Sequence, residues 1–125
     1  MMTRRTERLN SLLKEVITEV IREDVRNPYV PELLTITQVD ISKDLHYAKV
    51  FFSLIGTDEE KLKAQQALQS AAGFIAVTSS KKVVLRHFPE LTFKIDNSVD
   101  KHMRIEMALQ KIHEEENGRR HLTNQ

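Results

Sequence analysis

A run of small residues near the middle of the chain limits what this sequence can fold into. Ser70-Ala71-Ala72-Gly73 follows a helical pattern, and a different pattern begins at Phe74. Glycine costs a helix interior about 0.5–1 kcal/mol relative to alanine, so a helix through Gly73 is predicted to bend or break there. The small side chains also allow close approach of another backbone, from either a packed helix or a ligand.

The chain begins with a predicted amphipathic helix over residues 4–26. Its apolar residues recur at helical spacing and form one stripe: Leu9, Leu12, Leu13, Val16, Ile17, Val20, Ile21 and Val25. Asn27-Pro28 ends the pattern, because a residue before proline avoids the helical conformation. Arg4, Arg5 and Arg8 lie at its start, where the helix dipole disfavours cations. These arginines either precede the helix as mobile residues or serve a binding partner.

Two strands are predicted to follow as an antiparallel hairpin. Residues 34–42 are rich in β-branched side chains, and their alternation slips in a way that a bulge near Gln38 explains. Residues 47–55 alternate regularly and are expected to face the core with one set of side chains: Ala48, Val50, Phe52 and Leu54. Thr57 and Glu60 then match a capping box at the start of the helix that leads to Gly73.

The segment 74–88 is ambiguous from the residues alone. Its β propensity favours a second hairpin with a polar turn, whereas a helix would align Phe74, Val77, Val84 and Phe88. Residues 89–96 predict a third strand, and a further helix is expected from about residue 99. Residues 113–125 are polar and are expected to form a disordered tail.

Composition excludes several classes of protein. A chain of 125 residues is predicted to form one domain, and it has neither an apolar run of about 20 residues for a membrane span nor a secretory signal. The absence of cysteine excludes disulfides and thiol catalysis and fits the cytoplasm. The histidines lack metal-ligand spacing, and no glycine-rich loop could hold a nucleotide. The sequence therefore predicts no enzyme, metal, cofactor or small-molecule substrate.

The charge distribution points to a local basic patch. Net charge is only +1, but residues 76–111 carry seven basic against four acidic side chains. Such a patch can bind phosphate without an extreme overall charge. The alternative is that these lysines and arginines only solvate a surface.

Four segments, in their order and spacing, resemble the ribosome-binding factor A family of bacterial small-subunit assembly factors. They are Asn27-Pro28, residues 41–50 with Ile41-Ser42-Lys43-Asp44-Leu45, residues 71–75, and residues 85–98. The resemblance spans about residues 8–109. It implies an α+β fold: a single KH-like domain of the second topology, α-β-β-α-kink-α-β, over residues 1–112. In that fold a three-stranded sheet packs on helices, residues 74–88 are helical, and an extra C-terminal helix follows.

The resemblance also implies where RNA binds. Ala71, Ala72 and Gly73 match the family's Ala-x-Gly kink, which replaces the Gly-x-x-Gly loop of ordinary KH modules. On this basis an RNA backbone approaches the kink, and the next helix supplies charge through Lys81, Lys82 and Arg86. Arg4, Arg5 and Arg8 form a second anchor. The chain departs from the family at Ala76, where arginine is usual, at the polar residues 78–80, and at His102, where glycine is common.

By this resemblance the chain is a non-enzymatic factor that binds the 30S subunit and 16S ribosomal RNA. It would support maturation of the 16S 5′ end and adaptation to cold. Nothing in the sequence demands more than a monomer. Two rival functions stay open. One is a protein-interaction module that uses the outer sheet face (Tyr47, Phe51, Thr92 and Lys94), and the other is an RNA-processing nuclease. For Gly73 itself, the rival explanation is tight packing between two helices.

Overall fold

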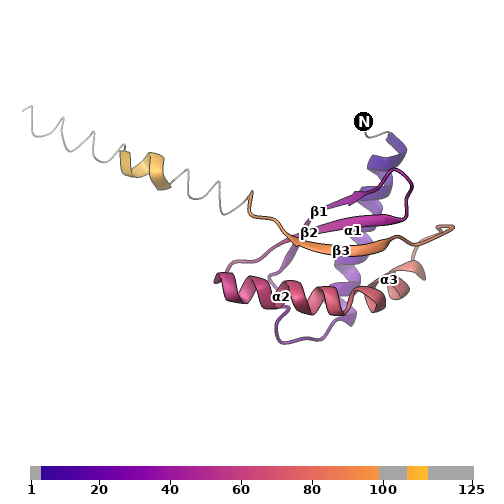
Figure 1. Cartoon of the computed structure of the whole chain (residues 1–125), viewed down its shortest axis with the longest axis horizontal. Helices are drawn as coiled ribbons and strands as arrows, with labels where there is room; N and C mark the ends of the chain where they lie inside the picture. The colour runs from indigo at the N-terminus through magenta and orange to yellow at the C-terminus, as the bar shows by residue number, and fades with distance from the viewer. Residues whose placement is uncertain (1–3, 99–106, 113–125) are drawn as a thin grey trace, which may run out of the picture.

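In the computed structural model, which describes residues 4–98 and 107–112, residues 4–98 form three helices and three strands. The helices are α1 (Arg4–Asp24), α2 (Asp58–Ser70) and α3 (Ala72–Ser80). The strands are β1 (Thr35–Ile41), β2 (Tyr47–Ser53) and β3 (Glu90–Ile95). This order, α-β-β-α-kink-α-β, confirms the predicted KH-like topology (Figure 1).

The strands of residues 4–98 make one sheet in the order β1-β2-β3. β1 and β2 pair antiparallel, with the register shifting between Ile36 and Gln38, which confirms both the hairpin and the bulge. β3 pairs parallel with β2, because α2 and α3 carry the chain back to the other end of the sheet. β2 is therefore the central strand.

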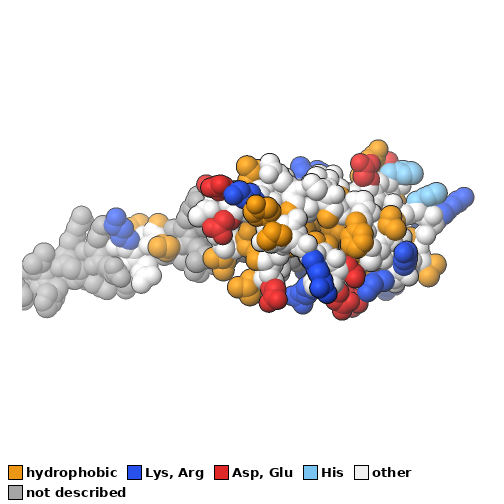
Figure 2. All heavy atoms as spheres, turned by 90° about the horizontal axis from the view of Figure 1, so that it is seen from below, with side chains coloured by type: hydrophobic (Ala, Val, Ile, Leu, Met, Phe, Trp, Pro, Cys, Tyr) orange, Lys and Arg blue, Asp and Glu red, His pale blue; other side chains and the backbone are white. Residues whose placement is uncertain are grey.

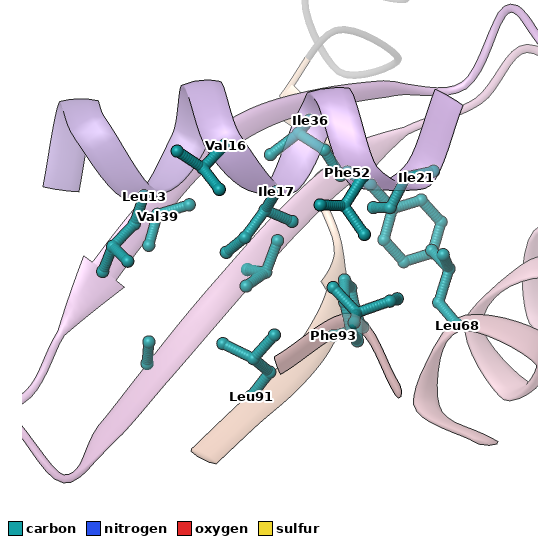
Figure 3. Close-up of a cluster of buried hydrophobic side chains, with 14 of the residues drawn as sticks. Leu13, Val16, Ile17, Ile21, Ile36, Val39, Phe52, Leu68, Leu91 and Phe93 are labelled. Carbon is teal, nitrogen blue, oxygen red and sulfur yellow. The ribbon is translucent and has the colours of Figure 1, made fainter. Parts of the chain in front are cut away.

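The three helices cover one face of the sheet and share a single core with it (Figure 3). The inward side chains of β2 and β3 are buried: Ala48, Val50, Phe52, Leu91 and Phe93. The α1 stripe packs over β1, while α2 and α3 pack against β3 and fully bury Leu68 and Ile75. The opposite sheet face, with Tyr47, Lys49 and Lys94, has no helix of residues 4–98 on it and is exposed.

For residues 74–88 the structure contradicts the predicted strands and confirms the predicted helix only as far as Ser80. α3 ends at Ser80, and residues 81–89 form a turn and loop. The helix forms despite its β propensity because Ile75 and Ser79, one turn apart, are both buried in the core. The predicted stripe is wrong as well, since Phe74 and Val77 face outward. Lys81 is consequently the C-cap of α3, and Lys82 and Arg86 lie beyond the helix rather than on it.

The remaining predictions concern the arginines at the start of α1 and the residues after β3. α1 begins at Arg4, so Arg4 and Arg5 belong to its first turn and do not precede it. Residues 107–112 are helical and exposed, in the region where a C-terminal helix was expected. Residues 99–106, and the tail predicted to be disordered (113–125), lie outside the described residues.

Candidate nucleic-acid interface

The junction between α2 and α3 bends at Ala71. This residue has φ −89° and ψ 0°, and its N–H donates to the carbonyls of Ala67 and Leu68, both at 3.1 Å. Its own carbonyl accepts from the N–H of Ile75 at 2.8 Å, so α3 starts at once in a new direction. No side chain caps the start of α3, and helix amides without such a cap favour an anion through the partial positive charge of the helix dipole.

Gly73 lies on the open side of this junction. A methyl group added at Gly73 would meet no other atom within 4 Å, and its φ is not positive. Neither helix packing nor backbone conformation therefore requires glycine here, which removes the rival explanation of tight helix contact. Next to it, Phe74 of α3 is 53% exposed. The helical alternative for residues 74–88 placed Phe74 on an apolar stripe, and no local signal marked this ring as exposed.

The two lysines at the end of α3 differ in their surroundings. Lys81 caps the helix and is exposed. The Lys82 ammonium lies 2.9 Å from the Glu19 carboxylate and 3.8 Å from that of Glu23, both on α1. The hydrogen bond to Glu19 raises the pKa of Lys82. Lys82 thus ties α3 to α1, and its charge is already matched.

Predicted RNA-binding arginines from two distant parts of the sequence lie around one cavity. Arg5 and Arg8 of α1 line the same cavity, of about 490 Å³, as Arg86 of the loop before β3. Arg4 lies on a neighbouring face of α1, beside Glu7 and Ser11. Figure 2 shows histidine and basic side chains gathered at the end of the molecule where this loop and the β1–β2 turn lie. The structure therefore separates the predicted site into the kink, the lysine pair and this arginine cavity.

Three internal contacts hold the walls of the arginine cavity in place. The buried Asn10 side chain of α1 accepts from the N–H of Ile41 at 2.9 Å, which ties the start of α1 to the end of β1. The His46 carbonyl accepts from the N–H of Glu90 at 2.8 Å, which ties the β1–β2 turn to β3. The rings of His46 and His87 stack at 6.4 Å between centroids. Sequence reasoning did not predict that these two rings meet, because His46 and His87 are 41 residues apart and were considered only as metal ligands.

The β1–β2 turn is stabilised by Asp44. Its carboxylate accepts from the Ser42 hydroxyl at 2.6 Å and from the His46 N–H at 3.0 Å. The Ser42 hydrogen bond, followed by that of His46, lowers the pKa of Asp44. Within the described residues no group of histidine and acidic side chains is arranged to hold a metal ion. No helix in the same residues has the length and apolarity that crossing a membrane requires.

The fold and the junction define a KH-like domain with a short kink in place of a glycine-rich loop. Comparison with known proteins narrows this class further. The family model for ribosome-binding factor A matches residues 5–109. The chain belongs to the ribosome-binding factor A family.

Relatives and solved structures agree with this assignment. A ribosome-binding factor A of Protochlamydia amoebophila is 66% identical over 119 residues, covering 95% of this chain and 91% of the relative. One from Chlamydia pneumoniae is 45% identical over 114 residues, covering 90% and 95%. The crystal structure of ribosome-binding factor A from Thermus thermophilus superposes with a TM-score of 0.64 at 27% identity, covering 72% of this chain and 94% of that one. A homology model of the Thermus protein fitted into a cryo-EM map of a 30S complex gives a TM-score of 0.60 at 26% identity, covering 72% and 93%.

Proposed function

We propose that this protein binds the 30S ribosomal subunit through 16S ribosomal RNA and assists late assembly of the subunit without catalysing a reaction. Membership of the ribosome-binding factor A family supports a ribosomal partner, as does the likeness to the Thermus protein in a 30S complex. In this proposal the protein acts in the cytoplasm as a monomer. It favours maturation of the 16S 5′ end and matters most in the cold, where RNA rearranges slowly.

The observation that carries this proposal is the open α2–α3 junction. Gly73 is exposed with free space beside it, the start of α3 has no side-chain cap, and Phe74 presents an exposed ring next to both. A phosphate is favoured at uncapped helix amides, and an exposed aromatic ring can stack on a base. Ala71, Ala72 and Gly73 are small enough to admit the RNA backbone. Lys81 and the arginines of the cavity would add longer-range attraction.

The mechanism needs no chemistry on the RNA. A protein that binds one conformation of an RNA more tightly than its alternatives shifts the population toward that conformation. The kink lacks the second glycine of an ordinary KH loop, so it is suited to structured RNA that is selected by shape and charge. Release would follow once the mature conformation no longer presents that shape.

The open sheet face supports a second candidate function as a protein-interaction module. Tyr47 is 57% exposed there, and farther along the same face Thr92 of β3 pairs with Lys49 and Lys94 pairs with Phe51. Salt separates the two functions, because phosphate binding weakens steeply with salt while contacts through an aromatic surface do not. Weak salt dependence of ribosome association would favour this second function.

Co-sedimentation with purified 30S, 50S and 70S particles tests the proposal. We expect the protein to pellet with free 30S subunits and to be lost from them as potassium chloride rises. Binding to 50S or 70S particles but not to 30S would contradict the proposal. Incubation with precursor 16S RNA and magnesium tests the rival nuclease, since specific cleavage would show that the protein is an enzyme.

A further inference from the structure

The lining of the arginine cavity combines apolar and cationic side chains. Its apolar part, called the leucine floor below, comes from Leu9 and Leu12 of α1, Leu45 of the β1–β2 turn and Leu85 of the loop before β3, beside Ile41 of β1. Leu12 and Leu45 remain more than a third exposed, at 42% and 37%, so this floor is accessible to a ligand. At about 490 Å³, the cavity falls within the roughly 300–1,000 Å³ of typical small-ligand sites.

The cationic part of the lining, called the rim below, comes from two elements. Arg5 and Arg8 stand one helical turn apart on α1, and Arg86 approaches from the loop. None of the three makes an ion pair within residues 4–98. The single acidic residue in the lining, Asp44, is engaged by the Ser42 hydroxyl and the His46 N–H. The field at the mouth therefore attracts anions.

The β1–β2 turn keeps an apolar residue where the backbone disfavours one. Leu45 has φ 64°, in the left-handed region that glycine and asparagine adopt more easily. Its side chain contributes to the cavity floor, next to the stacked rings of His46 and His87. The turn would be more stable with asparagine, so stability of the turn does not account for the leucine.

We infer that this cavity seats one unstacked nucleotide of a single-stranded RNA segment, with its base on the leucine floor and its flanking phosphates at Arg5, Arg8 and Arg86. The inference rests on the proposed RNA-binding function and adds a second contact, remote in sequence from the kink. A nucleotide within a strand has phosphates on both its 5′ and its 3′ side, which matches arginines that two separate elements bring to one apolar cavity. The imidazole pair offers a flat surface for the ring.

An acidic peptide with apolar side chains fits the same charge less well. Its backbone N–H and C=O groups would need hydrogen-bond partners, and leucine side chains supply none. A nucleobase can present its faces to the leucines and keep its polar edge toward water. RNA is therefore the occupant that leaves fewer polar groups without partners.

Methyl NMR of the full chain, with labelled leucines, tests the inference. The probes are hexaadenylate RNA, inorganic polyphosphate of equal charge, AMP, and an acidic leucine-containing peptide. We expect hexaadenylate to shift the methyl signals of Leu9, Leu12, Leu45 and Leu85, because the ring current of a bound base acts on them, and to leave Leu62 of α2 unchanged. Polyphosphate should leave these signals in place.

Leu45→Asn is the matched variant, because asparagine suits the left-handed backbone and removes the apolar side chain. It should keep the folded structure and weaken hexaadenylate binding roughly tenfold, as expected for loss of one base contact. Leu62→Asn, at an exposed leucine outside the cavity, is the control and should bind like the parent protein.

Several outcomes would overturn the inference. Equal leucine shifts with polyphosphate would show that bases are not needed, and shifts with the peptide alone would assign the cavity to a protein partner. Binding of AMP as tightly as hexaadenylate would assign it to a free nucleotide. Hexaadenylate binding without leucine shifts would place RNA elsewhere and leave the proposed function intact. That function fails separately if the parent protein does not sediment with 30S subunits.

Discussion

The hydroxyl of Ser79 is buried in the core of the domain without a hydrogen-bond partner among the described residues. A buried polar group without a partner costs about 1–3 kcal/mol. The same position brings α3 against the core, because Ser79 lies one turn after Ile75. Ser79 thus lies on the buried side of α3, and its unpaired hydroxyl lowers the stability of the domain.

Replacing Ser79 with alanine should raise the free energy of unfolding by about 1 kcal/mol, because the change removes an unsatisfied hydroxyl and improves helix propensity. Urea unfolding followed by circular dichroism measures the effect. Ser80→Ala is the control: its hydroxyl is exposed and donates to the Val77 carbonyl at 2.6 Å, so its removal should be nearly neutral. Destabilisation by Ser79→Ala would show that the hydroxyl has a partner after all.

At the scale of elements, Ala71 and Gly73 have different roles at the α2–α3 junction. The bend occurs at Ala71, whose backbone leaves the helical region, while Gly73 lies within the first turn of α3. Glycine destabilises this turn without relieving any contact. A feature that costs stability and has no packing role is a candidate for binding.

Gly73→Ala should therefore move stability and binding in opposite directions. We expect the free energy of unfolding to rise by about 0.5–1 kcal/mol, since alanine is the better helix former. Affinity for 30S subunits should fall by about tenfold, equivalent to ~1.4 kcal/mol, because the methyl group occupies the space that the RNA backbone would use. Thermal unfolding and quantitative co-sedimentation measure the two effects.

Ser70→Ala provides the control for this pair of measurements. It improves helix propensity at an exposed position in the last turn of α2 without adding a group beside Gly73. It should raise stability and leave 30S affinity unchanged. Unchanged affinity in Gly73→Ala as well would show that RNA does not approach the junction.

At the scale of the whole molecule, the position of a charge decides its role. Arg5, Arg8 and Arg86 converge on one cavity from distant parts of the chain, whereas Lys82 is paired with Glu19 and Glu23. A cation that already has a carboxylate partner gains less from a phosphate, because the existing pair must first be broken. The basic excess of residues 76–111 is therefore not a uniform patch.

Arg86→Ala should weaken binding to a 16S RNA fragment and reduce the slope of log affinity against log salt by about one unit, as loss of one phosphate contact does. Lys82→Ala is the matched control in the same segment, and its slope should stay near that of the parent protein. Filter binding over a series of potassium chloride concentrations measures both slopes. A larger change for Lys82→Ala than for Arg86→Ala would reverse the assignment.

Local patterns along the chain predicted most of the fold. The α1 stripe, the bulge near Gln38 and the capping box of Thr57 and Glu60 are all present, with both reciprocal hydrogen bonds in the box. These features depend on residues near one another in sequence, where spacing and propensity act directly. The break within residues 70–73 was predicted for the same reason.

Residues 74–88 show where local patterns were insufficient. β propensity favoured strands, yet α3 forms because Ile75 and Ser79 pack into a core made by distant residues of α1 and the sheet. The exposure of Phe74 follows from the same packing, since the opposite side of the helix faces the core. Propensity carries no information about which side of an element the rest of the chain will cover.

The small-residue run at 70–73 and the elements of residues 4–98 other than α3 are properties of the sequence by itself, because each follows from neighbouring side chains and backbone preferences. Which cations are available was decided only by the tertiary structure. Arg5, Arg8 and Arg86 line one cavity because Asn10 ties α1 to β1 and His46 ties the β1–β2 turn to β3. Lys82 instead forms ion pairs with Glu19 and Glu23, which lie 63 and 59 positions earlier in the chain. Electrostatic pairing depends on distance in space, and the folded chain sets that distance.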